Sequence, residues 1–227
     1  DRYPIELNNR RSVALARYKL GFLHYQHARA LRTEDPARAL ALYASAAESL
    51  EAAVVDLRVI TDDHPADTLL RSDLFLALRW LGYTRYRHAQ AVEGDKQTDL
   101  YEQGHRAFAQ ALAEAAAYRD AGGDIAPLES QIYAAANGLC NIAYRTKRGD
   151  RMVAAADAAH DLMAEPSTTL LGQRALGLDL MDQTADEYDF QISWNANNAD
   201  EAAVVKKLET VGQVLSQYDR QGQARYD

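Results

Sequence analysis

The stretch LALRWLGYTRYRHAQA, residues 76–91, repeats an earlier stretch of the same chain, LARYKLGFLHYQHARA at residues 15–30. The identical pairs are Leu15/Leu76, Ala16/Ala77, Leu20/Leu81, Gly21/Gly82, Tyr25/Tyr86, His27/His88, Ala28/Ala89 and Ala30/Ala91. A looser third copy places Ala135, Leu139 and Tyr144 where the second has Ala77, Leu81 and Tyr86. A helical hairpin cannot cover its own apolar face, but a second hairpin stacked beside it can. The repetition therefore predicts stacked helical hairpins.

Apolar residues recur at helical spacing along almost the whole chain, and no alternation of period two is sustained, so we expect no sheet. The expected helices span about 6–32, 36–60, 67–92, 98–120, 150–164, 168–188 and 202–218, with one more in the third copy. The fold class is thus predicted as all-α, a right-handed stack of antiparallel hairpins with about eight helices. We expect one domain over residues 1–227, with repeat pairs at about 6–60, 67–120 and 127–164 and C-terminal helices and a cap at about 168–219.

Small residues in the repeats indicate how the helices pack. Gly21 and Gly82 are expected where one helix closely approaches its partner. The second helices share the spacing of Ala39, Tyr43 and Ala46 with Gly104, Phe108 and Ala111, at an offset of 65 rather than 61. We attribute the difference to a loop that is four residues longer in the second hairpin.

Composition and charge exclude several classes of protein. The formal charge is −8 and the pI is near 5.3, which argues against a general nucleic-acid surface. A single cysteine, Cys140, excludes an internal disulfide framework. No apolar run approaches the roughly 20 residues needed to cross a bilayer, so we expect no membrane insertion. These features leave the compartment open between the cytoplasm and the periplasm.

The pattern Leu-Gly in the first helix, followed one helix later by Ala39-x3-Tyr43-x2-Ala46 or Gly104-x3-Phe108-x2-Ala111, resembles tetratricopeptide (TPR) repeats. The resemblance covers about 15–165, and its period is near 60 rather than the 34 residues of the family. Tyr25 and Tyr86 also lie one residue later than the family's aromatic position. The resemblance implies a TPR-like α-solenoid and a protein- or peptide-binding role without catalysis.

The longer period and the pattern LALYASAAESLEAAV…DDHPAD…RSDLFLALRWLG also resemble TPR-like regions of bacterial eukaryotic-like Ser/Thr kinases. This second resemblance implies a regulatory or sensory region of a larger signalling protein. The chain begins at Asp1 without Met, which suggests either a processed protein or a part of a longer one with further domains on the N-terminal side. The resemblance transfers no catalytic residue.

The TPR resemblance also implies which residues line a binding groove on the first helices. They are Tyr18, Phe22, Tyr25, Arg79, Tyr83, Tyr86, Asn137, Asn141 and Tyr144, with Arg87 and Arg145 nearby. Aromatic rings supply rigid contact area, and Arg or Asn can hold a carboxylate or a peptide backbone. The alternative for Tyr25, Tyr86 and Tyr144 is packing between repeats. We expect alanine at Arg79 and Tyr83 to weaken partner binding with little effect on stability.

Other chemistry receives no support from the motifs. His24, His27 and His88 lie on neighbouring first helices but lack the spacing of metal ligands, so we expect no metal site. Cys140 has no recognisable base and is interpreted as a small core residue. We therefore expect no catalytic residue and no cofactor. The alternative function is structural, with self-association into a homodimer through the apolar stripe of the last helix, Val204, Val211 and Leu215.

Overall fold

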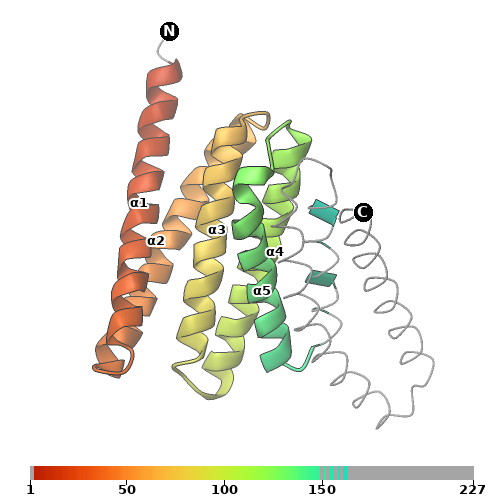
Figure 1. The fold of residues 1–227 in the computed structure, drawn as a ribbon. Helices are drawn as coiled ribbons and strands as arrows, with labels where there is room; N and C mark the ends of the chain where they lie inside the picture. The colour runs from red at the N-terminus through yellow and green to blue at the C-terminus, as the bar shows by residue number, and fades with distance from the viewer. Residues whose placement is uncertain (1–2, 149–150, 152–153, 156–157, 159–160, 163–227) are drawn as a thin grey trace, which may run out of the picture.

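The computed structural model describes residues 3–148 together with 151, 154, 155, 158, 161 and 162, and the regular structure among them is entirely helical. The elements are α1 (Tyr3–Leu31), α2 (Pro36–Asp63), α3 (Thr68–Ala89), α4 (Gly94–Asp120), the short 3-10 helix η1 (Ala126–Leu128) and α5 (Glu129–Arg145) (Figure 1). The all-α prediction is confirmed for this part of the chain. The described residues of the helix expected at 150–164 are helical too. The helices expected at 168–188 and 202–218, and the cap, lie outside the described residues.

Each of the five α-helices packs on the next one in the chain, and α5 lies in front of α4 and beside α3 (Figure 1). α1 also contacts α3, and α3 also contacts α5. These three helices therefore share one face of the molecule, which we call the odd-helix face. All the residues that the sequence assigns to a binding groove belong to these three helices. The N-terminal end of α1 extends beyond its neighbours (Figure 1).

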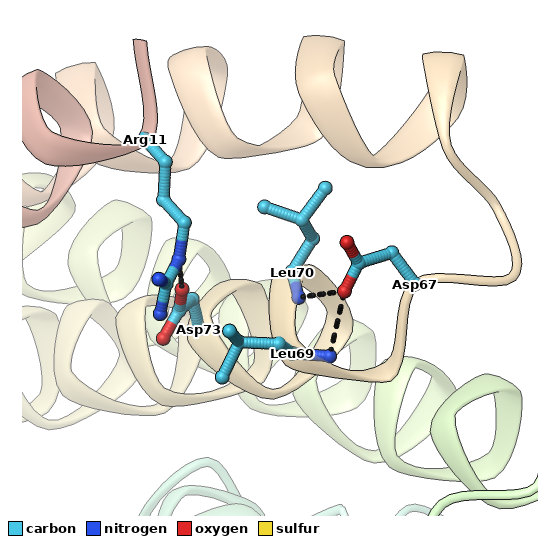
Figure 2. Close-up of polar contacts among 5 residues, drawn as sticks. All are labelled: Arg11, Asp67, Leu69, Leu70 and Asp73. Carbon is cyan, nitrogen blue, oxygen red and sulfur yellow. Dashed lines mark hydrogen bonds and ion pairs between the residues drawn. The ribbon is translucent and has the colours of Figure 1, made fainter. Parts of the chain in front are cut away.

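Side-chain caps fix where two of the helices begin. Asp35 accepts a hydrogen bond from the backbone nitrogen of Arg38 at 3.0 Å, and Pro36 occupies the first turn of α2, as the sequence predicts. Asp67 accepts from the backbone nitrogens of Leu69 at 2.9 Å and Leu70 at 3.2 Å (Figure 2). Each carboxylate thus satisfies amide donors that the first turn leaves without a helical partner.

Replacement of Asp67 by alanine should lower the free energy of unfolding by about 1 kcal/mol, because the first turn of α3 loses its acceptor and a favourable negative charge. Urea titration followed by circular dichroism would measure the change. Asp62→Ala is the matched control, since Asp62 is exposed near the end of α2 and caps no helix. Equal stabilities for the two variants would contradict the assignment of Asp67 as the cap.

An ion pair ties α1 to α3 near this cap. The Arg11 Nε lies 2.6 Å from an Asp73 carboxylate oxygen (Figure 2). Both side chains are largely shielded, with 25% of Arg11 and 12% of Asp73 exposed. The pair engages the carboxylate of Asp73, which lies on the same helix as Arg79.

The start of α4 differs from the prediction. The sequence EGDKQT was expected to separate two helices, but α4 already begins at Gly94. The Gln97 amide donates to the carbonyls of Ala89 at 3.0 Å and Val92 at 2.8 Å, so this first turn satisfies acceptors at the end of α3. The two hairpins have linkers of equal length, 32–35 and 90–93, and the prediction of a longer loop is wrong. The extra residues extend α4.

Close approaches at glycine are confirmed. A Cβ atom on Gly21 would lie 2.6 Å from Leu50 Cγ and 3.0 Å from the Ala46 carbonyl of α2. A Cβ on Gly82 would lie 2.7 Å from the Phe108 ring of α4. The absence of a side chain at these positions lets each first helix approach its partner. The sequence pattern therefore identified both hairpin contacts correctly.

Candidate functional site

The predicted site residues differ in how deeply they lie. Tyr25, Arg79 and Tyr86 are buried. Those that are half-buried are Tyr18, Phe22, Tyr83, Arg87, Asn137 and Asn141. The side chain of Tyr144 lies outside the described residues, and Arg145 is exposed. The odd-helix face thus presents partly exposed rings and amides around a deeper arginine.

Arg79 is the central charged group of this face. Its side chain is only 6% exposed, and its guanidinium carbon lies 4.4 Å from the centroid of the Trp80 ring and 5.7 Å from that of Tyr83. Its Nε atom is buried without a hydrogen-bond partner in the described part of the chain. Burial lowers the pKa of Arg79, while Tyr83, Tyr18 and Tyr25 act in the opposite direction. A guanidinium remains charged under these conditions. The site therefore holds a cation between aromatic rings.

Trp80 joins the aromatic rings of α1 to those of α3. Its ring centroid lies 4.7 Å from Phe22 in an edge arrangement, 5.2 Å from Tyr25 and 5.8 Å from Tyr83. We call Tyr18, Phe22, Tyr25, Trp80 and Tyr83 the aromatic cluster. The sequence prediction of the site omitted Trp80. Its position next to Arg79, and three residues before Tyr83 on the same helix, is the signal that could have identified it.

The charge of Arg79 affects the pKa values of two tyrosines of the cluster, Tyr18 and Tyr83. Burial raises the pKa of the Tyr18 hydroxyl, and the nearby Arg79 charge partly opposes this change. Burial likewise raises the pKa of the Tyr83 hydroxyl, and the Arg79 charge again partly opposes the change. Both phenols are therefore neutral at physiological pH and lie beside the cation.

Tyr83 also has a structural role. Its hydroxyl donates to the Ala134 carbonyl of α5 at 2.8 Å, and its ring packs edge-on against Phe108 with centroids 5.0 Å apart. Alanine at this position would remove packing between α3, α4 and α5 as well as any ligand contact. A Tyr83→Ala variant is therefore expected to lose stability, contrary to the expectation from the sequence.

Tyr25 and Tyr86 occupy packing positions. Tyr25 is 3% exposed, and the centroid of its ring lies 6.1 Å from that of the buried Tyr43 ring of α2. Tyr86 is 6% exposed and packs on Tyr101 of α4 at 6.1 Å. These contacts agree with the packing alternative. The partly exposed rings of the aromatic cluster are therefore those of Tyr18, Phe22, Trp80 and Tyr83.

Polar side chains of α3 and α5 also form hydrogen bonds with one another within each helix segment. Arg87 Nη1 donates to Gln90 Oε1 at 2.8 Å, and the Gln90 amide donates to the Tyr86 hydroxyl at 2.8 Å. On α5, Asn141 donates to the Asn137 carbonyl at 2.9 Å and to the Asn137 side-chain oxygen. The amides provide the donors and acceptors that an extended peptide backbone requires.

The remaining candidates from the sequence are the histidines and the cysteine. His24 is half-buried, His27 is exposed and His88 is 4% exposed. Cys140 is 1% exposed and belongs to the core, as predicted. Among the described residues no group of three or more His, Cys, Asp or Glu side chains is arranged to hold a metal ion.

No helix in the described part of the chain is long and apolar enough to cross a membrane. Comparisons with protein-family models, with curated proteins and with solved structures gave no match.

Proposed function

We propose that this chain is a non-enzymatic module that binds a protein or peptide along the odd-helix face. The observation that supports it is the aromatic cluster, in which partly exposed rings from α1 and α3 surround a buried arginine. Aromatic and arginine side chains dominate the energetics of protein interfaces because they supply large contact areas and directional donors. The amides of α5 extend the face with groups that suit a peptide backbone.

The proposal includes a TPR-like stack of hairpins as the scaffold. Its support is the repeated Leu-Gly sequence together with the contacts of α1 with α3 and of α3 with α5. We further propose that the chain is the interaction or sensory region of a larger bacterial signalling protein such as a Ser/Thr kinase, on the sequence resemblance described above. The stripe for self-association, at Val204, Val211 and Leu215, lies outside the described residues.

The test compares two neighbouring residues of α1 that face different surroundings. Phe22 is half-buried and packs on Trp80, whereas Leu23 is 62% exposed. Peptides selected by the wild-type chain from a random dodecapeptide display library would be measured by isothermal titration calorimetry against Phe22→Ala and Leu23→Ala. We expect Phe22→Ala to weaken binding about tenfold or more, as loss of an interface anchor does, and Leu23→Ala to leave it unchanged.

Two outcomes would contradict the proposal. One is the absence of any enriched peptide. The other is an equal effect of the two substitutions, which would place the binding surface elsewhere. Thermal unfolding of both variants controls for loss of the fold.

A further inference from the structure

Several arginines have an acidic partner on another helix. The ion pairs are Arg10–Asp63, Arg11–Asp73, Arg17–Asp56, Arg71–Glu114, Arg85–Glu51 and Arg151–Glu102. In each pair a carboxylate from another element balances the guanidinium charge. Even Arg17, which is largely exposed, has such a partner.

Arg79 departs from this pattern although it is more deeply buried than any of these arginines. Within the described part of the chain, no carboxylate forms an ion pair with it, and its Nε atom has no hydrogen-bond partner. The charge of Asp73 contributes to raising the pKa of Tyr18, which lies beside Arg79. The Asp73 carboxylate is, however, already paired with Arg11. The contacts of Arg79 are instead the faces of Trp80 and Tyr83.

An unpaired buried charge is costly, because the guanidinium loses its hydration without an equivalent replacement. The cation–π contacts with Trp80 and Tyr83 recover only part of this cost. A methionine or leucine would fill the same space without this cost. The side chain is therefore better suited to receiving an anion than to stabilising the folded chain.

We infer that Arg79 is the receptor for a carboxylate of the bound peptide, an inference that rests on the proposed peptide-binding function. A planar guanidinium with rings beside it is fixed in orientation and presents its donors at its edge, where a carboxylate can accept two of them. The Tyr18 hydroxyl lies beside the same charge and accepts a hydrogen bond from Trp80, so its own O–H can donate to the carboxylate.

A carboxylate fits this site better than a phosphate. Arg79 carries one positive charge, and Arg87, the next arginine of the face, already donates to Gln90. A phosphate group with nearly two negative charges normally requires several cations. The chain as a whole is acidic, with a formal charge of −8, which adds repulsion against a doubly charged group.

The first experiment uses small anions as probes. N-acetylglycine imitates a peptide C-terminus, N-acetylglycinamide is its neutral counterpart, and inorganic phosphate is the competing anion, all compared at equal ionic strength. The wild-type chain, Arg79→Met and Arg58→Met are compared by thermal unfolding. Arg58 is a matched control because it lies on α2, outside the odd-helix face, and donates a hydrogen bond to the Gln110 side chain at 3.3 Å.

We expect N-acetylglycine, but not its amide, to raise the Tm of the wild-type chain and of Arg58→Met, because a ligand that binds only the folded state stabilises it. Arg79→Met should not respond, and its Tm without ligand should exceed that of the wild type. A response to N-acetylglycine that survives in Arg79→Met overturns the inference. So does stabilisation by phosphate alone, or the absence of any response in the wild type.

The second experiment separates this inference from the proposed function. Peptides selected by the wild-type chain would be resynthesised with the terminal carboxylate amidated and with Asp and Glu replaced by Asn and Gln. We expect removal of the recognised carboxylate to weaken binding about 10- to 100-fold in the wild type and to have no effect in Arg79→Met. Peptides that bind equally well without a carboxylate would leave the peptide-binding function standing and overturn the role of Arg79. A response to N-acetylglycine without any bound peptide would support the carboxylate receptor and contradict peptide binding.

Discussion

Replacement of Phe108 by alanine should lower the free energy of unfolding by about 3–5 kcal/mol, the range observed for fully buried aromatic residues. The Phe108 ring is 0% exposed and lies against Gly82 of α3 on one side and Gly138 of α5 on the other. The Tyr83 ring packs edge-on against it. One side chain therefore joins three helices, and its removal leaves a cavity that two helix backbones would have to move to fill.

Urea unfolding monitored by circular dichroism at neutral pH would measure this change. Val59→Ala is the control, since Val59 is 47% exposed on α2 and should change stability by about 0.5 kcal/mol or less. A loss below about 1 kcal/mol for Phe108→Ala would contradict the packing described.

The double variant Gly82→Ala/Phe108→Leu provides a second check. Alanine at Gly82 should destabilise the wild-type chain despite its better helix propensity, but much less beside the smaller leucine.

The fold was predictable from sequence where local pattern and packing agree. The spacing of Ala39, Tyr43 and Ala46 requires a helix with one buried side, and all three residues are buried. The repeated glycines mark close approaches because no other residue fits there. The start of α4 was not predictable in this way, because Gln97 acts on the carbonyls of a different helix and its sequence alone resembles a loop.

The candidate site was predictable only in outline. The repeat pattern placed Arg79 and Tyr83 on the same face of one helix, and the structure brings both beside Tyr18 of α1. Burial depth and ion pairing depend on residues far apart in the sequence, such as Arg11 and Asp73. The sequence therefore contained no sign that Arg79 differs from the other arginines. Gly138 was missed for a similar reason, since its contact with Phe108 crosses between hairpins.

Stability should fall as the pH is lowered from 7 to 4, and His88 should account for up to about 3 kcal/mol of this loss. Burial, reinforced by the charges of Lys96 and Arg85, lowers the pKa of His88 from 6.5 to about 4. The ring is stacked on Tyr43 with centroids 6.4 Å apart, and neither of its nitrogens has a hydrogen-bond partner among the described residues. Between pH 6.5 and 4 the unfolded chain therefore binds a proton that the folded chain excludes, which favours unfolding.

The variant His88→Phe isolates this contribution, because the chain contains many other titrating groups and a phenylalanine ring retains the stack on Tyr43. The difference in unfolding free energy between wild type and variant should be constant above pH 7 and change by up to about 3 kcal/mol between pH 6.5 and 4, with the variant becoming relatively more stable. His27→Phe is the matched control, since His27 is the repeat-equivalent residue on α1 and is exposed. Parallel pH profiles for wild type and His88→Phe would show that the ring is protonated within the folded chain. That result would require an acceptor or a water-accessible path at His88, because a charged imidazole without either would be expelled from the contact with Tyr43.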